Sequence, residues 1–281
     1  MRLLVTGAGG QFGHDLARCC TAAGDDVVAL DRAALDVTDR AAVTDAVDSH
    51  RPDLVVNAAA WTAVDACEAD PERAFRQNAD AVGFLREACD RTGAHLLQVS
   101  TDYVFDGTLD RPYREDDATN PLSVYGRSKL AGELAAGERA TIVRTSWLCG
   151  AAGGNMVKTV LRLLRTHEPL AFVTDQRGCP TFTADLAVAV RELALQRRAG
   201  IFHMTNQRAV SWYEFVREVV AAAGADPDVV RPILAAELDP PRPAPRPANS
   251  VLANDAIRAA GLPLLRDHAE PLEELVHQLG V

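Results

Sequence analysis

The sequence of 281 residues has no long hydrophobic run and no basic segment. No stretch of about 18 consecutive apolar residues occurs, so we expect no membrane span. The chain passes directly from Met1 into a short apolar stretch that ends at a glycine, and we therefore expect no signal peptide. The formal net charge of -10 argues against nucleic acid or an anionic membrane surface as the main partner.

Paired cysteines and clustered histidines are also missing. The six cysteines, none in a C-x-x-C pair, are Cys19, Cys20, Cys67, Cys89, Cys149 and Cys179. This spacing indicates neither a zinc site nor a disulfide framework. We interpret these residues as the reduced thiols of a cytoplasmic protein, and we predict no bound metal.

The composition that remains is typical of a compact globular protein. Hydrophobic residues make up 48% of the chain and charged residues 24%, unlike a disordered sequence. The length favours one large domain or two modest ones. No internal repeat is visible.

The first 150 residues alternate short apolar runs with longer amphipathic segments. We expect strands at 2–6, 27–31, 53–58, 96–100 and 141–148, and helices at 12–23, 40–50, 71–92 and 125–136. Strands that alternate with helices in this way are typical of βαβ units. This half of the chain therefore predicts an α/β fold with a parallel sheet.

The alternation is less regular after residue 150. We expect helices at 155–166, 185–196, 211–223 and 268–279, and strands at 170–173 and 200–204. Ser211 and Glu214 fit a capping box at the start of one helix. Residues 239–247 contain five prolines and exclude a helix or central strand. That segment is either a stiff spacer or a support that aims the polar residues at 246–250 into a cleft.

A glycine-rich sequence, GAGGQFG at residues 7–13, lies where the first strand meets the first helix. Gly7 allows a tight turn, Gly10 lets the backbone approach a pyrophosphate, and Gly13 lets the helix pack closely on the strand. The helix N-terminus adds free N–H groups and a positive dipole. The context predicts a dinucleotide-binding loop.

The end of the second strand carries two residues with opposite preferences. Asp31 is placed to meet the ribose of NAD, whereas Arg32 could pair with the 2′-phosphate of NADP. Asp36 and Val37 are placed to meet the adenine, although Asp36 could equally cap a helix. The cofactor preference stays open at this point.

Small residues follow the third strand. Residues 57–62 read NAAAWT, which leaves room for a cofactor to lie across the carboxyl end of the sheet. Ala60, Trp61 and Thr62 are therefore candidate cofactor contacts, while ordinary close packing is the alternative.

Tyr125 and Lys129 are four residues apart and lie on one face of a predicted helix. Such a pair also occurs by chance on exposed helices, but the upstream glycine loop favours a catalytic role. The Lys129 ammonium is expected to lower the pKa of the Tyr125 phenol, which would then donate a proton to a carbonyl. Thr101, at the end of another strand, could hydrogen-bond the same carbonyl. Asp102 could orient the substrate or cap a turn.

Together these motifs resemble the dTDP-4-dehydrorhamnose reductase family of the extended short-chain dehydrogenase/reductase superfamily. The matching segments are 7–13 (GAGGQFG), 57–60 (NAAA), 62–65 (TAVD), 100–105 (STDYVF), 125–133 (YGRSKLAGE), 144–147 (RTSW), 175–181 (DQRGCPT) and 246–250 (RPANS). The last three are more particular to this family than the others, and the resemblance runs nearly from end to end.

The resemblance implies a Rossmann-like, doubly wound parallel sheet with a smaller C-terminal α/β region. Residues 1–150 would form the NAD(P)-binding domain and residues 151–281 mainly the substrate-binding region, with some segments returning to the first domain. The implied reaction is NAD(P)H-dependent reduction of the 4-keto group of dTDP-4-dehydro-6-deoxy-L-mannose to dTDP-L-rhamnose. NADPH is the expected cofactor, NADH is the alternative, and a homodimer is compatible with the family.

The resemblance also assigns roles to individual residues. The proton donor falls on Tyr125, the helper hydroxyl on Thr101 and the ribose-binding lysine on Lys129. Cofactor contacts carry over to Gly10, Gln11, Phe12, Asp31, Asp36, Val37, Ala60, Trp61, Thr62 and Val99. Gly7, Gly13 and Arg32 complete the expected cofactor site, and Tyr125 and Lys129 are expected to contact the cofactor as well. Substrate contacts carry over to Thr101, Asp102 and Trp147, and we infer that Arg246 and Asn249 line the sugar-nucleotide end.

Two departures from the family limit these assignments. Some relatives form a dimer around Mg²⁺, and the matching positions here are Asp15 and Ala184. Because alanine cannot ligate a metal, the sequence does not support Mg²⁺, although Asp185 adjoins that position. Trp61 replaces a small histidine-containing turn, which would alter the nicotinamide pocket.

Three alternative functions were weighed. A dehydratase on this fold would need a glutamate after Asp102, and Tyr103 stands there instead, so elimination lacks its base. A reductase of another dTDP-4-keto-6-deoxyhexose in a secondary-metabolite pathway stays open. A regulatory NADP-binding subunit would not require Thr101, Tyr125 and Lys129 together.

Overall fold

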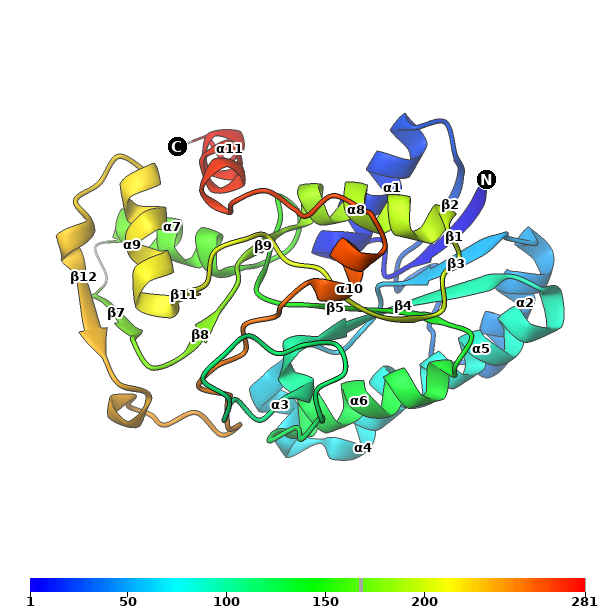
Figure 1. Cartoon of the computed structure of the whole chain (residues 1–281), viewed down its shortest axis with the longest axis horizontal. Helices are drawn as coiled ribbons and strands as arrows, with labels where there is room; N and C mark the ends of the chain where they lie inside the picture. The colour runs from blue at the N-terminus through cyan, green and yellow to red at the C-terminus, as the bar shows by residue number, and fades with distance from the viewer. Residues whose placement is uncertain (167–168, 281) are drawn as a thin grey trace.

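The centre of the protein is a parallel sheet, seen on the right of the computed structural model in Figure 1. Within the described residues, 1–166 and 169–280, this sheet has six strands in the order β10-β5-β4-β3-β1-β2. They are β1 (Arg2–Thr6), β2 (Asp26–Leu30), β3 (Leu54–Asn57), β4 (His95–Thr101), β5 (Thr141–Thr145) and β10 (Gly200–His203). The chain crosses from β2 over β1 to β3, so a crevice opens at the carboxyl ends of β1 and β3.

Helices cover both faces of the sheet, as the alternation of side chains along its strands requires. Leu3 and Val5 of β1 face one core, and Leu4 faces the other. The first face carries α1 (Gln11–Ala22), α8 (Thr183–Leu195) and α10 (Asp255–Ala259), and the second carries α2 (Arg40–His50), α5 (Ala81–Thr92) and α6 (Val124–Ala136). This arrangement confirms the predicted α/β, Rossmann-like doubly wound sheet.

A second hydrophobic core holds a smaller lobe, on the left of Figure 1. Its elements are α7 (Met156–Thr166), β7 (Leu170–Val173), α9 (Trp212–Ala222), β12 (Val230–Ile233) and α11 (Ala269–Gln278). Two short pairs join it to the sheet region: β6 (Leu148–Cys149) with β9 (Thr181–Phe182), and β8 (Arg177–Gly178) with β11 (Val210–Ser211). Strand β10 and helix α8 lie between these segments in sequence but belong to the larger lobe.

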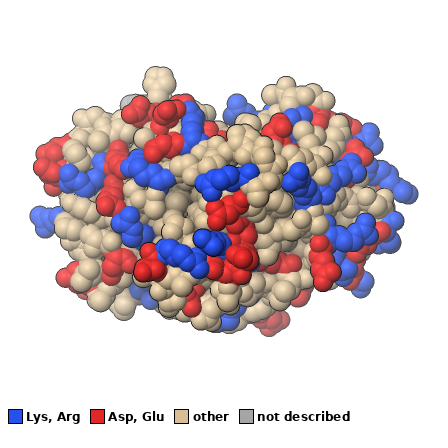
Figure 2. Space-filling view, viewed as in Figure 1, with Lys and Arg blue, Asp and Glu red and all other residues tan. Residues whose placement is uncertain are grey.

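The remaining described elements are short. They are α3 (Val64–Ala69), α4 (Pro71–Phe75), the π-helix η1 (Arg76–Asp80) and the 3₁₀-helices η2 (Asp102–Val104), η3 (Pro227–Val229) and η4 (Ala235–Glu237). No described helix is long and apolar enough to cross a bilayer. On the face shown in Figure 2, acidic and basic side chains are interspersed rather than gathered by sign.

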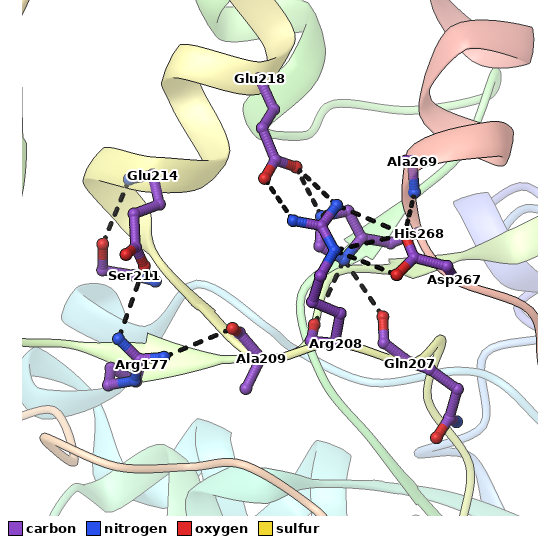
Figure 3. Close-up of polar contacts among 10 residues, drawn as sticks. All are labelled: Arg177, Gln207, Arg208, Ala209, Ser211, Glu214, Glu218, Asp267, His268 and Ala269. Atoms are coloured by element: carbon purple, nitrogen blue, oxygen red, sulfur yellow. Dashed lines mark hydrogen bonds and ion pairs between the residues drawn. The ribbon is translucent and has the colours of Figure 1, made fainter.

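A polar network in the smaller lobe ties α9 to the start of α11 (Figure 3). The Arg208 guanidinium contacts Glu218 at 2.6 Å and Asp267 at 3.0 Å. His268, which is fully buried, meets the same Glu218 carboxylate at 2.6 Å. Burial alone would raise the pKa of Glu218, but the hydrogen bonds from His268 and Arg208 hold it below its usual value. The network therefore fixes the C-terminal helix by charge as well as by packing.

Most of the predicted elements are present with bounds shifted by a few residues. The capping box of Ser211 and Glu214 is confirmed, and the predicted helix 71–92 is present as α4, η1 and α5, with an unexpected π-helical turn. The prediction of one strand over 141–148 is wrong. Trp147 has φ 46°, a left-handed conformation that ends β5 and separates it from β6.

Candidate active site

The glycine-rich loop between β1 and α1 packs directly against the chain that follows β3. A Cβ atom at Gly7, where φ is 68°, would lie 2.6 Å from the Ala59 nitrogen. A Cβ atom at Gly13 would lie 2.3 Å from the Gly7 carbonyl oxygen. Only glycine fits at these two positions, and the resulting loop leaves the N-terminus of α1 facing the crevice.

A cavity of about 440 Å³ opens beside this loop. Its lining residues are Gly7, Gly9, Gly10, Asp31, Arg32, Ala33, Leu35, Asp36, Val37, Thr38, Ala58, Ala59, Ala60, Trp61 and Gln77. The predicted cofactor residues among them are Gly7, Gly10, Asp31, Arg32, Asp36, Val37, Ala60 and Trp61. The cavity thus collects the residues expected at the adenosine and pyrophosphate end.

Two carboxylates at this end are held by backbone N–H groups. Asp31 Oδ1 accepts from the nitrogens of Ala33 and Ala34 at 3.0 and 2.9 Å. Asp36 Oδ1 accepts from the nitrogen and hydroxyl of Thr38, and these bonds hold the pKa of Asp36 below its usual value. The N-cap of α2 is Asp39, so the alternative that Asp36 caps this helix does not hold.

Seven predicted cofactor residues lie outside the cavity lining, namely Val99, Tyr125 and Lys129 near the end of β4 and four residues elsewhere: Gln11, Phe12, Gly13 and Thr62. The Gln11 side chain donates to the Gly154 carbonyl at 3.0 Å and accepts from the Gly150 nitrogen at 2.9 Å. Phe12 is buried in the core beneath α1. Thr62 is exposed, and Gly13 serves the close packing of α1. Gln11 therefore joins the glycine loop to the loop before α7.

The Thr101 and Tyr125 side chains meet at the carboxyl end of β4. The Thr101 hydroxyl lies near enough to the Tyr125 phenol to oppose part of the effect of burial on the Tyr125 pKa, while its own proton is donated to Asp102 Oδ1. Helix α6 carries Tyr125 on its first turn, where the Ser123 hydroxyl caps the helix by accepting from the Gly126 nitrogen. The Tyr103 ring packs edge-on against Tyr125, with centroids 5.6 Å apart. The two hydroxyl-bearing side chains are therefore held close together at the carboxyl end of β4.

Lys129 lies one helical turn after Tyr125 and is buried. Its Nζ donates to the Val99 carbonyl at 2.7 Å. Burial lowers the pKa of Lys129 to about 8. The expectation that Lys129 lowers the pKa of Tyr125 is wrong for this arrangement: burial raises the Tyr125 pKa above its usual value because the phenolate would be desolvated. Tyr125 is consequently a protonated phenol, the form that can donate.

Asp102 follows directly and is completely buried. Its Oδ1 accepts from the Thr101 hydroxyl at 2.9 Å. The nearby Ser250 hydroxyl donates to the Arg177 carbonyl instead, so Asp102 Oδ2 has no hydrogen-bond partner among the described residues. Burial raises the pKa of Asp102 to about 6. An unpartnered carboxylate oxygen at such a depth is a candidate acceptor for a ligand hydroxyl.

Trp147 packs where the smaller lobe meets the sheet. Its ring is stacked on Trp212 with centroids 3.5 Å apart and an interplanar angle of 7°. On its edge, a Cβ atom at Gly178 would lie 2.6 Å from Trp147 Cε2. The indole is therefore held in one orientation by residues of the smaller lobe.

The proline-rich segment crosses back to the larger lobe through Arg246. The guanidinium pairs with Asp65 of α3 at 2.7 Å, and the Ala244 nitrogen donates to the same carboxylate at 3.1 Å. The Tyr103 hydroxyl contacts Arg246. The Asn249 amide instead donates to the carbonyls of Leu109 and Arg111, so the structure uses this side chain to hold a loop.

A family model described as the RmlD substrate binding domain matches residues 1–281. A protein of Streptomyces griseus named dTDP-4-dehydrorhamnose reductase is 46% identical over 97% of this chain and 92% of its own. This chain belongs to the dTDP-4-dehydrorhamnose reductase family. A Streptomyces antibioticus member, named probable dTDP-4,6-dihydroxy-2-methyloxan-3-one 4-ketoreductase, is 44% identical over 98% of this chain and 94% of its own.

A solved structure of the family has the same fold. The dTDP-4-dehydrorhamnose reductase of Bacillus anthracis, solved in complex with NADP, superposes with a TM-score of 0.94. It is 34% identical, and the match covers 99% of both chains. The close approaches at Gly7 and Gly13, with the cavity beside them, fit a nicotinamide dinucleotide. The protein is an oxidoreductase of this reductase family.

The metal site of some family members does not fit this chain. Asp15 Oδ2 accepts a hydrogen bond from the Thr183 hydroxyl at 2.5 Å, and Ala184 offers no ligand. Within residues 1–166 and 169–280, no group of three or more His, Cys, Asp or Glu side chains could hold a metal ion.

Sequence reasoning missed a buried polar chain that links the glycine loop to Lys129 of the reductase. The Thr6 hydroxyl donates to Asn57 at 2.5 Å, and the Asn57 amide donates to Gln98 at 2.7 Å. Gln98 then donates at 2.6 Å to the Val99 carbonyl, which also accepts from Lys129. The sequence could have indicated this chain, because three polar residues near the ends of adjacent buried strands need hydrogen-bond partners in the interior.

Proposed function

We propose that this protein reduces the 4-keto group of dTDP-4-dehydro-6-deoxy-L-mannose to give dTDP-L-rhamnose, with NADPH or NADH as reductant. The observation that supports the proposal is the closeness of Thr101 and Tyr125 at the carboxyl end of β4, with Lys129 one helical turn after Tyr125. Lys129 contacts the Val99 carbonyl, which a buried polar chain connects to the glycine loop. A carbonyl that accepts from both hydroxyls would be polarised and supplied with a proton in one place.

The chain's own groups have separate tasks in this reaction. The cofactor, when bound, supplies the hydride that attacks the carbonyl carbon. Tyr125 would give its phenolic proton to the developing alkoxide, and the Thr101 hydroxyl, which donates to Asp102 Oδ1 in this structure, would turn to stabilise the same oxygen. Lys129 would bind the ribose hydroxyls of the cofactor. The raised pKa of Tyr125 keeps its proton available through the neutral range.

The smaller lobe and its neighbours are proposed to bind the sugar nucleotide. Asp102 Oδ2 would accept from a sugar hydroxyl, because it is buried and has no partner among the described residues. Trp147, held in place by Trp212 and Gly178, would contact the sugar nucleotide from the smaller lobe. Arg246, whose guanidinium is held by Asp65, would contact the diphosphate. The role of Asn249 would be to hold the loop at 109–111 against this segment.

A reductase of another dTDP-4-keto-6-deoxyhexose is the second candidate. The relative from Streptomyces antibioticus, named as a probable ketoreductase of a different dTDP sugar, is nearly as similar as the first at 44% identity. Both candidates use the same proton donor and cofactor site. They differ in which sugar fits between Asp102 and Trp147.

The deciding experiment follows NADPH oxidation with dTDP-4-dehydro-6-deoxy-L-mannose as substrate. We expect turnover that a Tyr125→Phe variant loses, and NMR of the product should show the L-rhamnose configuration at C4. Turnover only with a different 4-keto sugar would favour the second candidate. No oxidation above the Tyr125→Phe background with any such sugar would favour a regulatory subunit instead.

We expect the cofactor preference to depend on Asp31 and Arg32, which line the same cavity. Arg32→Ala should lower kcat/KM for NADPH by roughly 10-fold, and kcat/KM for NADH should be almost unchanged. This loss is at the lower end of the range for a hydrogen bond to a charged group, because the site is exposed. Asp31→Ala should do the reverse, because it removes the acceptor for the 2′-hydroxyl and a repulsive charge beside a 2′-phosphate.

The measurement is the ratio of kcat/KM for the two cofactors at low and at high ionic strength. The Arg32 contribution should shrink in salt, since both side chains are exposed. Equal losses with NADPH and NADH in the Arg32 variant would show that this arginine does not read the 2′-phosphate.

A further inference from the structure

A buried ion pair lies directly beneath the proposed catalytic residues. The Glu133 carboxylate accepts from Arg144 Nε at 2.9 Å and from Nη2 at 2.7 Å. It also accepts from the Ser100 hydroxyl at 2.5 Å. The side chains of Glu133 and Arg144 are only 5% and 3% exposed, so the pair is shielded from water and salt.

Three secondary-structure elements meet at this pair. Ser100 and Arg144 are direct partners in the register of the neighbouring strands β4 and β5. Glu133 reaches both of them from α6, which packs across the sheet. The carboxylate therefore fixes α6 to two strands, and the next residue of β4 is Thr101.

Tyr125, Lys129 and Glu133 occupy three successive turns on one face of α6. Residues four apart in a helix lie about 5–6 Å apart at Cβ. Tyr125 meets Thr101, Lys129 meets the Val99 carbonyl, and Glu133 meets Ser100, so β4 receives all three side chains along its length. The helix has little freedom to shift, since a Cβ atom at Gly126 would lie 2.2 Å from the Tyr103 carbonyl oxygen.

We propose that Glu133 is a positioning residue. Its carboxylate, held by Ser100 and Arg144, fixes α6 against the end of β4 and contributes a negative charge that stabilises the Lys129 ammonium. The expected effect on turnover rests on the proposed function, in which Lys129 takes part in the reaction, whereas the expected effect on the Lys129 pKa does not. Glu133 itself touches neither the substrate nor the cofactor, and it acts through Lys129 and the seating of Tyr125.

The electrostatic argument depends on which charges surround Lys129. Burial lowers the Lys129 pKa, and the Glu133 charge acts against that effect. Helix α6 carries Tyr125, Arg127 and Glu133 besides Lys129. The groups on neighbouring elements that act on these residues or contact them include Arg144, Asp102, Tyr103, Cys67 and Glu68. Glu133 and Arg144 form a pair of opposite charges, so removing either one leaves the other uncompensated in a low-dielectric interior.

The two single substitutions should therefore move Lys129 in opposite directions. Glu133→Gln removes the negative charge and leaves Arg144 unpaired, so the Lys129 pKa should fall by about one pH unit, the low end for a charge roughly 4–6 Å away. Arg144→Met removes the positive charge and keeps most of the side-chain volume, so the Lys129 pKa should rise. The double variant should lie between them.

Lys129 can be observed directly because the chain contains only two lysines, Lys129 and Lys158. Lysine labelled with ¹³C at Cε gives two resonances, and a Lys158→Arg variant assigns them. Titration of each variant then reports the Lys129 pKa without any need for turnover. The pH profile of kcat is measured in parallel, and its alkaline limb should follow the Lys129 pKa in both directions.

Opposite shifts in the two single variants would support the proposal, because a merely structural pair would lower stability without such a pattern. An unchanged Lys129 titration, or shifts in the same direction, would overturn it. If a single variant does not fold, comparison of the folded single variant with the double variant still gives the sign of one charge. The Lys129 pKa could shift as expected while the pH profile of kcat stays unchanged. That result would support the effect of Glu133 on Lys129 and contradict the proposed catalytic role of Lys129.

Discussion

Tyr125→Phe is expected to lower kcat by about 10²–10⁴-fold, the range that a general acid contributes. The substitution removes only the hydroxyl that meets Thr101, and the ring keeps its packing against Val124 and Cys67. Cofactor binding should be unchanged, because Tyr125 does not line the cavity beside the glycine loop. The measurements are steady-state kcat and NADPH binding by calorimetry.

Tyr113→Phe is the matched control for this loss. Tyr113 is also buried, and its hydroxyl donates to Asp106 at 2.8 Å, away from Thr101. We expect kcat within about 2-fold of the wild type and a stability loss of about 1–3 kcal/mol, because the Tyr113 hydroxyl also accepts from the Leu109 nitrogen and two hydrogen bonds are lost. A Tyr125→Phe enzyme that keeps kcat within roughly 10-fold would show that another group delivers the proton.

The sheet of this protein could be predicted because its strands are short apolar runs, four of which end at asparagine or threonine. The strand Arg2–Thr6 and the helix Arg40–His50 lie at their predicted bounds. The break inside 141–148 could not be predicted in this way. Its sequence is a continuous run suited to a strand, and only the stack with Trp212 and the approach of Gly178 impose the left-handed conformation at Trp147.

In the site too, local sequence patterns predicted which residues come together, but not the effects that depend on tertiary packing. Helical spacing placed Tyr125 near Lys129, and strand ends placed Thr101 and Asp102 at the carboxyl edge of the sheet. The direction of a pKa shift depends on burial, which spacing does not reveal. Burial therefore raises the Tyr125 pKa where proximity to a lysine alone predicts a decrease. The role of Asn249 similarly depends on a loop 138–140 residues away in sequence.

Asp102→Asn is expected to stabilise the protein at pH 8 and to impair its reaction. Burial raises the pKa of Asp102 from 3.8 to about 6 in the folded chain. A group whose folded pKa is raised favours folding only while it is protonated, so the wild type loses stability as the pH rises from about 4 through about 6. The difference of roughly two pH units corresponds to a cost of about 3 kcal/mol above pH 7.

Asparagine has the same shape, keeps an oxygen that can accept from Thr101, and carries no charge. The free energy of unfolding, measured in urea, should therefore exceed that of the wild type by up to about 3 kcal/mol at pH 8 and match it near pH 4. Asp106→Asn is the control of opposite sign. Four hydrogen bonds, first those from Thr108 and Asn120, hold the Asp106 pKa below its usual value, so its replacement should destabilise the protein at neutral pH.

Measurement of kcat/KM tests whether the Asp102 carboxylate, which destabilises the folded protein above pH 6, is used to bind the substrate. If Asp102 accepts a hydrogen bond from a sugar hydroxyl, Asp102→Asn should lower kcat/KM by roughly 10- to 100-fold, the equivalent of about 1.5–3 kcal/mol for a hydrogen bond to a charged group. The loss should be largest above pH 6, where the wild-type carboxyl is ionised. A variant that gains stability at pH 8 and keeps its full kcat/KM would show that the substrate does not use this carboxylate, and the unpartnered oxygen would need another explanation.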